Sequence, residues 1–141
     1  MIQFKFYKND ENLEDGYQVR EAVFVREQGF KDEFDEIDYC CTHVVLYDGE
    51  KSVATGRVFT NESGEMTLGR ICVLNDYRGQ GCGALIIEKL EEKARELGAK
   101  EVHLGAQEHA LGFYQKLGYE VIGEGYDDQG SPHRHMIKKL L

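Results

Sequence analysis

The sequence predicts a mixed α/β fold, an α+β arrangement in which helices flank one central mixed sheet. Apolar residues alternate with period two in several short runs, whereas three segments repeat them at helical spacing. One of these helical segments lies between two predicted strands, which is the arrangement of a parallel crossover. Because the 141 residues contain no linker, internal repeat or low-complexity stretch, we expect a single domain over residues 1–141.

The first half of the chain predicts a strand, a helix and a three-stranded meander. Residues 2–8 alternate and predict the strand, and residues 13–28 carry apolar side chains at helical spacing. An acidic, irregular connection over residues 29–42 follows. Gly49-Glu50 is a hairpin signal between the first two strands of the meander. The three predicted strands cover residues 43–48, 51–60 and 65–74.

The second half begins with a long predicted helix over residues 81–97. Ile86 and Leu90 lie on its apolar face, and Gly98 is a suitable residue to end it. A strand, a shorter helix and two further strands follow, with a loop predicted at residues 125–132 between the last two. These four elements are expected over residues 100–106, 108–118, 119–124 and 133–141. The predicted order is therefore β-α-β-β-β-α-β-α-β-β.

The composition excludes several classes of protein. The formal charge is −9, from 17 Lys and Arg against 26 Asp and Glu, which argues against a nucleic-acid partner. No apolar run approaches the roughly 18–20 residues of a membrane span, so no membrane partner is expected. The N-terminal residues alternate and then become acidic, unlike a signal peptide. We therefore expect a cytoplasmic protein.

The four cysteines form no metal signature. Cys40 and Cys41 are adjacent and lie near His43, but no C-x-x-C pair exists. The expected interpretation is that the cysteines are small thiols in a reducing compartment, and no metal site is predicted. A cysteine-based redox or metal protein is the alternative from a different functional class.

A glycine-rich stretch, Arg-Gly-Gln-Gly-Cys-Gly, occupies residues 78–83 directly before the long predicted helix. Its G-x-G-x-G spacing departs from the G-x-G-x-x-G of a Rossmann turn, and it lacks the G-K-[ST] of a Walker A loop. The stretch suits another kind of phosphate cradle, in which backbone N–H groups of residues 78–84 and the positive end of the helix face phosphate oxygens. From the glycines alone, a plain strand-to-helix turn stays open as the alternative.

The context of this stretch resembles a known family. Residues 70–106 resemble the acetyl-CoA-binding core of the GCN5-related N-acetyltransferases, the GNAT superfamily. Arg78, Gly81 and Gly83 match the Gln/Arg-x-x-Gly-x-Gly/Ala signature of that family, and residues 106–124 are similar to its next block. The resemblance implies a GNAT-like acyl-CoA N-acyltransferase fold, with acetyl-CoA as co-substrate and no metal.

The resemblance also indicates which residues contact the co-substrate. In the family, the strand before the glycine loop splays from its neighbour and offers backbone groups to the pantetheine arm, in the manner of strand addition. A residue that follows the next strand also contacts this arm. The expected co-substrate contacts are Ile71, Cys72, Val73, Arg78, Gly79, Gln80, Gly81, Cys82, Gly83, Ala84, Gln107 and Tyr114.

Two residues are expected to carry the chemistry. Tyr114 takes the position where relatives place a hydroxyl beside the CoA sulfur, so we expect it to be the general acid; a core aromatic is the alternative. His133 matches the histidine of a Pro-His-x-x-Met closing strand and is the expected base. The base stays open among further candidates, which are His135, His43, Glu27, Asp38 and water. His103 and His109 are interpreted as surface or supporting residues.

The sequence thus predicts an acetyl-CoA-dependent N-acetyltransferase that transfers the acetyl group directly to a primary amine of a small molecule. The acidic run at residues 32–38 follows the first helix, where the family often covers the acceptor site, and it would favour a cationic amine. A catalytically silent acetyl-CoA sensor is the alternative within the family. The identity of the amine and the oligomeric state, including a homodimer, stay open.

Overall fold

A mixed sheet forms the centre of the fold, as predicted. Within residues 1–31 and 34–140, which a computed structural model describes, it has seven strands in the order β1-β2-β3-β4-β5-β7-β6. Every neighbouring pair is antiparallel except β4 and β5, which are parallel. The strands are Ile2–Lys8 (β1), Thr42–Asp48 (β2), Lys51–Thr60 (β3), Met66–Val73 (β4), Glu101–Gln107 (β5), Glu120–Asp128 (β6) and Ser131–Lys139 (β7).

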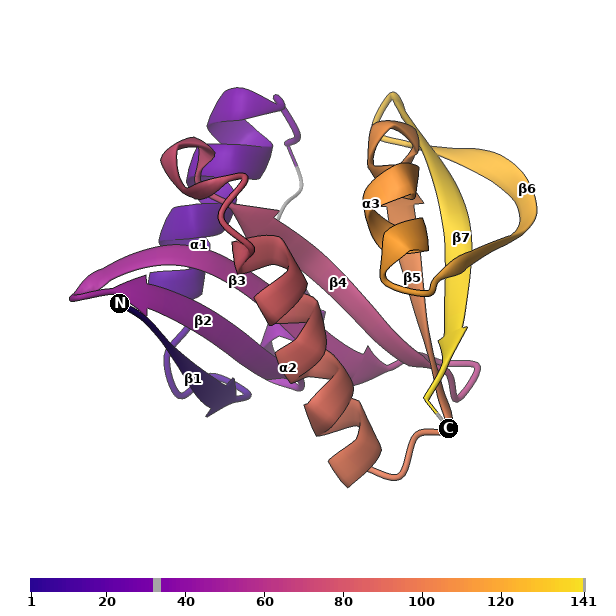
Figure 1. Cartoon of the computed structure of the whole chain (residues 1–141), viewed down its shortest axis with the longest axis horizontal. Helices are drawn as coiled ribbons and strands as arrows, with labels where there is room; N and C mark the ends of the chain where they lie inside the picture. The colour runs from indigo at the N-terminus through magenta and orange to yellow at the C-terminus, as the bar shows by residue number, and fades with distance from the viewer. Residues whose placement is uncertain (32–33, 141) are drawn as a thin grey trace.

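Helices cover both faces of the sheet (Figure 1). The long helix α2 and the short helix α3 lie on one face, and α1 with its π-helical continuation η1 lies on the other. The helical segments are α1 (Glu14–Arg20), η1 (Glu21–Glu27), η2 (Glu36–Tyr39), η3 (Asn75–Tyr77), α2 (Cys82–Glu96), η4 (Glu108–Ala110) and α3 (Leu111–Lys116). No helix in the described part of the chain is long and apolar enough to cross a membrane.

The predicted order of strands and helices is confirmed, with three corrections to individual segments. The helix expected over residues 13–28 changes from α to π at Glu21, where backbone hydrogen bonds such as Gln28 N–H to Val23 O reach back five residues, at 3.0 Å. The irregular connection contains the 3₁₀ turn η2. Two residues of the acidic run, Asp32 and Glu33, lie outside the described residues.

The loop expected at residues 125–132 is wrong. β6 and β7 pair as far as Asp128 and Ser131, so the connection shrinks to Gln129 and Gly130. Both connecting residues have left-handed backbones, with φ of 51° and 81°. This is the geometry of a two-residue hairpin turn, whose twist matches that of the strands it joins. The predicted end of the last strand, residue 141, lies outside the described residues.

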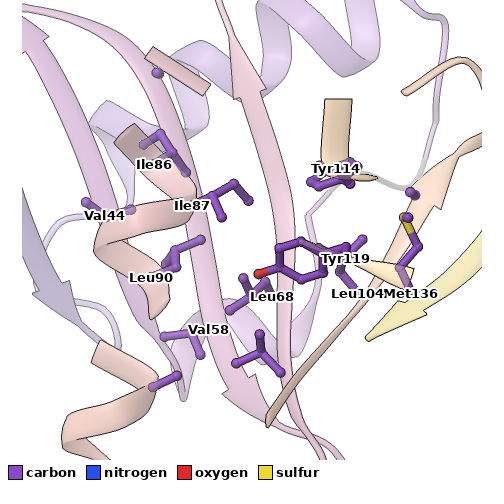
Figure 2. Close-up of a cluster of buried hydrophobic side chains, with 14 of the residues drawn as sticks. Val44, Val58, Leu68, Ile86, Ile87, Leu90, Leu104, Tyr114, Tyr119 and Met136 are labelled. Carbon is purple, nitrogen blue, oxygen red and sulfur yellow. The ribbon is translucent and has the colours of Figure 1, made fainter. Parts of the chain in front are cut away.

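The main core lies between α2 and the sheet (Figure 2). Ile86, Ile87 and Leu90 of α2 are buried against β-strand residues, in accordance with the predicted apolar face. A Cβ on Gly56 of β3 would lie 2.8 Å from side-chain atoms of both Ile86 and Leu90, so the absence of a side chain there lets the helix pack closely. Burial of this apolar stripe is what fixes α2, and with it the glycine loop at its N-terminus.

The parallel pair β4–β5 is bonded over a very short length. Its register contains only Thr67 with His103 and Leu68 with Leu104. β4 nevertheless continues to Val73 beside β3, and β5 continues to Gln107 beside β7. The two strands therefore diverge beyond Leu68, as Figure 1 shows. Their facing backbone edges open a gap in the middle of the sheet.

A buried ion cluster lies between the first helical layer and β3. The Asp38 carboxylate is fully buried and accepts hydrogen bonds from Arg20, at 2.7 and 3.1 Å, and from Arg57, at 2.8 Å. Arg57 also makes two hydrogen bonds to Asp35, at 2.6 and 3.0 Å. Burial alone would raise the pKa of the Asp38 carboxyl, but Arg20, the Asp35 N–H and Arg57 together hold that pKa at about 2. The cluster ties η2 to α1 and β3.

Replacing Asp38 by Asn should destabilise the fold strongly, because Arg20 and Arg57 would keep their charges in a buried place. We expect the free energy of unfolding to fall by about 3 kcal/mol, measured by urea denaturation at pH 7. The matched control is Asp35→Asn, which should cost less because the Asp35 side chain is 33% exposed.

The same variants test the charge of Asp38 through pH. Since folding lowers this pKa, the stabilisation is present above the ordinary aspartate pKa and is lost as the pH falls towards 2. The wild type should therefore lose roughly 2 kcal/mol more than Asp38→Asn over this acid range. Parallel stability curves for the two proteins would contradict the role given to the Asp38 carboxylate.

Candidate active site

The gap between β4 and β5 is a cavity of about 760 Å³. Its walls come from β3, β4 and η1 on one side and from β5, α3 and the β6–β7 hairpin on the other. The glycine loop that precedes α2 closes one end. The cavity collects most of the residues that the sequence predicts for co-substrate binding, namely Ile71, Cys72, Val73, Arg78, Gly79, Gly81, Cys82, Gly83, Ala84, Gln107 and Tyr114. The predicted base, His133, also lines it.

The glycines of the loop serve two different purposes. Gly79 and Gly81 have left-handed backbones, with φ of 76° and 83°, and no atom lies within 4 Å of the place a Cβ would take. Gly83 has ordinary backbone angles, and a Cβ there would lie 3.1 Å from the Phe113 ring. The first two glycines shape the loop, whereas the third lets α2 pack against α3.

The loop ends as the open N-terminus of a helix. Gly81 is the N-cap of α2, and the described residues place no side-chain cap on it. The first N–H groups of a helix have no partner within the helix and carry the positive end of its dipole. A 15-residue helix that begins at the cavity wall is thus suited to bind an anion such as a phosphate.

The side chains of two predicted loop residues bond to the protein itself. Arg78 donates two hydrogen bonds to the carboxylate of Glu27, at 2.6 and 2.8 Å, and one to the carbonyl of Val73, at 3.0 Å. This side chain fastens the loop to η1. Gln80 does not line the cavity, and its amide donates to the Asp76 carbonyl at 3.1 Å. The cradle expected from this stretch therefore depends on its backbone.

Tyr114 lies on α3 at the cavity wall and is only 9% exposed. Burial raises the pKa of its hydroxyl well above the ordinary value, and the nearby Cys72 adds to this effect. The hydroxyl is therefore protonated at neutral pH and available as a donor. Its ring packs edge-on against Phe113 and Tyr119, with centroid distances of 5.0 and 5.9 Å. Figure 2 shows the Tyr114 side chain at the margin of the core.

His133 lies at the start of β7 and is 8% exposed. Its Nδ1 is 2.8 Å from the Ser131 carbonyl, so Nδ1–H is the donor of this bond. A neutral imidazole with its proton on Nδ1 carries the free lone pair on Nε2. The ring is stacked on Tyr126, with centroids 5.6 Å apart and planes at 29°.

Three of the other candidate bases, His135, His43 and Asp38, do not line the cavity. His135 shares a hydrogen bond of 2.9 Å with His103 and does not line the cavity. His43 is buried, donates through Nε2 to the Asp38 carbonyl at 2.9 Å, and has a pKa lowered by burial. Asp38 is enclosed by two arginines, as described above. Neither its carboxylate nor the His43 ring faces the cavity.

Glu27 is the one alternative carboxylate that does line the cavity, and its two oxygens are held by Arg78. The hydrogen bond from Arg78 lowers the pKa of Glu27, which weakens it as a base. His109 lines the cavity as well. Of the two interpretations given for His103, a surface residue is wrong, because it is 6% exposed and bonds Glu101 and His135, each at 2.9 Å; a supporting residue stays a prediction.

The cysteines are spread over the molecule. Cys41 and His43 are close, with Sγ and Nε2 3.4 Å apart, while Cys40 is exposed. Cys72 and Cys82 are buried and line the cavity. Within residues 1–31 and 34–140, no group of three or more His, Cys, Asp or Glu side chains is arranged to hold a metal ion.

Sequence reasoning missed the aromatic and basic residues at the far end of the cavity. Tyr126 lies in the stretch that was expected to be a loop, so its place on β6 was hidden. Arg57 belongs to a strand whose pattern gives no sign of function, and Arg70 has the unusual φ of 50° for a residue with a side chain. Phe24 and Phe30 complete this end of the cavity.

Comparison with known proteins identifies the class. A family model described as the acetyltransferase (GNAT) domain matches residues 9–140. The chain therefore belongs to the GNAT acetyltransferase family, and by family and fold it is an N-acetyltransferase. The fold class predicted from the sequence is confirmed with it.

Individual relatives support this assignment. The chain is 44% identical over 134 residues to YjcF of Bacillus subtilis (strain 168), an uncharacterized N-acetyltransferase, with 93% of this chain and 95% of YjcF covered. It is similar to the crystal structure of Escherichia coli ElaA, with a TM-score of 0.88, 30% identity and coverage of 99% and 100%. A GNAT family acetyltransferase from Elizabethkingia anophelis, solved with acetyl-CoA bound, shares the fold at a TM-score of 0.77 and 13% identity, with coverage of 99% and 98%.

The loop makes a testable prediction about anion binding. Gly81→Ala forces a side chain into a left-handed backbone, which costs about 1–2 kcal/mol and shifts the N–H groups at the start of α2. We expect affinity for CoA, measured by calorimetry, to fall by about tenfold or more. Gly49→Ala is the matched control, because Gly49 also has a positive φ, of 63°, with open space around it, in a distant hairpin. Unchanged CoA affinity in a folded Gly81→Ala protein would remove the phosphate-cradle interpretation.

Proposed function

We propose that this chain transfers the acetyl group of acetyl-CoA directly to a primary amine of a small molecule. The observation that carries the proposal is a single cavity lined by the glycine loop, the part of β4 that diverges from β5, Tyr114 and His133. When bound, acetyl-CoA supplies a thioester whose carbonyl the amine can attack without a covalent enzyme intermediate. The fold shared with the acetyl-CoA-bound Elizabethkingia anophelis protein supports the choice of donor.

The cavity fits such a donor at both of its recognition points. The left-handed glycines and the uncapped start of α2 offer N–H groups to a pyrophosphate. The β4–β5 register ends at Leu68, so the later part of β4 faces the opening and its backbone can bind an extended amide-containing arm in the manner of an added strand. On the opposite lip, Gln107 donates to Gln28 Oε1 at 2.9 Å, which links the two walls.

Tyr114 is the proposed general acid. Because burial raises its pKa, the hydroxyl keeps its proton at neutral pH and is available as a donor. It can donate a hydrogen bond to the departing thiolate and share its proton with that sulfur as negative charge develops there, and a positioned general acid typically contributes roughly 10²- to 10⁴-fold in rate. The packing of the ring against Phe113 and Tyr119 fixes the direction of the hydroxyl.

His133 is the proposed base for the amine. The Ser131 carbonyl binds Nδ1–H and leaves Nε2 as the acceptor. Among the base candidates, His133 combines cavity exposure with a free ring nitrogen, whereas Glu27 is held by Arg78. After proton uptake, the stacked ring of Tyr126 can stabilise the imidazolium.

The shape of the cavity supports a small-molecule amine rather than a protein chain. The Lys31 N–H, just beyond η1, donates to Gln129 Oε1 in the β6–β7 turn at 2.9 Å, so the Gln129 side chain bridges the two walls of the cavity. The cavity volume, about 760 Å³, is in the range of small-molecule sites. The cavity lining includes arginines and aromatic rings, and so it adds no support to the expectation that the acidic run favours a cationic amine.

An acceptor screen tests the proposed function. The protein is incubated with acetyl-CoA and a panel of amines, and free CoA thiol is measured. The proposal expects thiol release that depends on an amine. Tight acetyl-CoA binding by calorimetry with no turnover over a wide panel would instead favour a silent sensor.

Tyr114→Phe tests the acid. The ring still packs, so acetyl-CoA affinity should stay within a small factor of wild type, while kcat falls by about 10²-fold, or roughly 3 kcal/mol. The loss should shrink with an acyl donor whose leaving group needs no proton. Normal single-turnover rates in Tyr114→Phe would show that Tyr114 is only a core aromatic.

His133→Ala tests the base through pH. Only the neutral imidazole accepts a proton, so the wild-type rate should rise with pH through one ionisation, and His133→Ala should flatten that limb. His135→Ala is the matched control, because His135 lies two residues away on the same strand but outside the cavity. It should keep the limb. An unchanged pH profile in His133→Ala would assign the proton transfer to another group or to water.

A further inference from the structure

We infer that Tyr126 is a positioning residue for the base, and that Gly105 lacks a side chain in order to admit the Tyr126 hydroxyl. The inference rests on the proposed role of His133 and deepens it. Three observations on neighbouring strands support it. The strand β6 contains a bulge, and the Tyr126 ring stacks on the His133 ring of β7. The place that a Cβ on Gly105 of β5 would take is occupied by the Tyr126 hydroxyl.

The bulge determines where the Tyr126 side chain points. Ile122 pairs with His135 and Tyr126 pairs with His133, so β6 advances by four residues while β7 advances by two. Within the bulge, Gly123 has a φ of 71°, and its carbonyl accepts a hydrogen bond of 2.8 Å from Arg134. Bulges of this kind bend the strand and redirect side chains, often beside active sites.

From this bulge the Tyr126 side chain crosses the strand next to it. Its ring stacks on the His133 imidazole of β7, with centroids 5.6 Å apart. Its hydroxyl then reaches β5, because an ideal Cβ on Gly105 would lie 2.1 Å from Tyr126 Oη and 3.5 Å from Cζ. Any side chain at Gly105 would occupy the place of the hydroxyl. Tyr126 therefore spans three strands along the wall of the cavity.

This arrangement restrains the imidazole from two sides. The Ser131 carbonyl holds Nδ1, and the Tyr126 ring covers one face, so the ring plane and the direction of Nε2 are both fixed. Tyr126 lines the cavity and is 44% exposed, which means that little other packing holds it in place. The close approach of the Tyr126 hydroxyl to Gly105 then determines where the Tyr126 ring lies. Displacing a catalytic group by about 1 Å can cost on the order of 10²-fold in rate.

The test uses a pair of substitutions that should cancel. Gly105→Ala puts a methyl group where Oη lies and should push the ring away, whereas removing Oη leaves Cζ at 3.5 Å, an ordinary contact. Gly105→Ala/Tyr126→Phe should therefore recover the stack that Gly105→Ala loses. Gly112→Ala is the control for an added methyl, because nothing lies within 4 Å of that position.

The first readout is the Cε1–H signal of His133 in an NMR spectrum of histidine-labelled protein without ligand, assigned with His133→Ala. The Tyr126 ring current should shift this signal. Gly105→Ala should move it to the position found in Tyr126→Ala, and the double variant should return it to the position found in Tyr126→Phe. An unmoved signal in Gly105→Ala would overturn the inference.

The second readout is kcat with the best amine of the acceptor screen. Gly105→Ala should lower kcat by about 10- to 100-fold with an unchanged KM for acetyl-CoA, and Tyr126→Phe should rescue most of the loss. In a His133→Ala background, Gly105→Ala should have no further effect. A loss that persists there, or that resists rescue, would show that the methyl group acts directly and would overturn the inference. The NMR measurement needs no turnover, so it tests the placement of the Tyr126 ring by itself. Whether His133 acts as the base is tested separately by the pH profile of His133→Ala.

Discussion

The site depends on the early end of pairing between β4 and β5. After two paired positions the strands part, and the sheet acquires a wedge-shaped opening at its centre. Each side of the opening is supported by a neighbouring strand, because β4 is paired with β3 and β5 with β7 along most of their lengths. Rigid outer pairing combined with an unpaired interior lets the fold keep a deep cavity without losing its sheet. The apolar stripe of α2 then places the glycine loop at one end of that cavity.

Particular residues show how much of the structure can be predicted from the sequence. The period of two and the helical spacing predict nearly every element, because these patterns follow from which face each element buries. The glycine stretch predicts a phosphate loop, although the contact of Gly83 with Phe113 across two helices is invisible in the sequence. Tyr126 was missed because the turn-forming residues around it resemble a loop, and the bulge that keeps them in a strand arises only from pairing with β7.

Ion pairs between residues that are far apart in the sequence are a second feature that the sequence does not predict. Asp38 belongs to an acidic run that reads as solvated, yet its carboxylate is fully buried between Arg20 and Arg57, 18 and 19 residues away. The local sequence around these residues does not indicate that they form ion pairs with one another. Arg57 lines the cavity while it bonds Asp35 and Asp38, so the cluster that secures the fold also forms part of the cavity wall. Substitutions that alter this part of the wall are thereby coupled to stability.

Because of the opening in the sheet, the free energy of unfolding depends on the concentration of the ligand that fills it. The β4–β5 register ends at Leu68 and Leu104, so the later parts of both strands face the opening. A ligand that bridges them binds the native chain and not the unfolded one, so it adds RT ln(1 + [L]/Kd) to the free energy of unfolding. At a concentration of 100 Kd this amounts to about 2.7 kcal/mol. If the donor is the ligand that fills the opening, the population of folded enzyme, and with it resistance to proteolysis, would follow the size of the coenzyme pool in the cell.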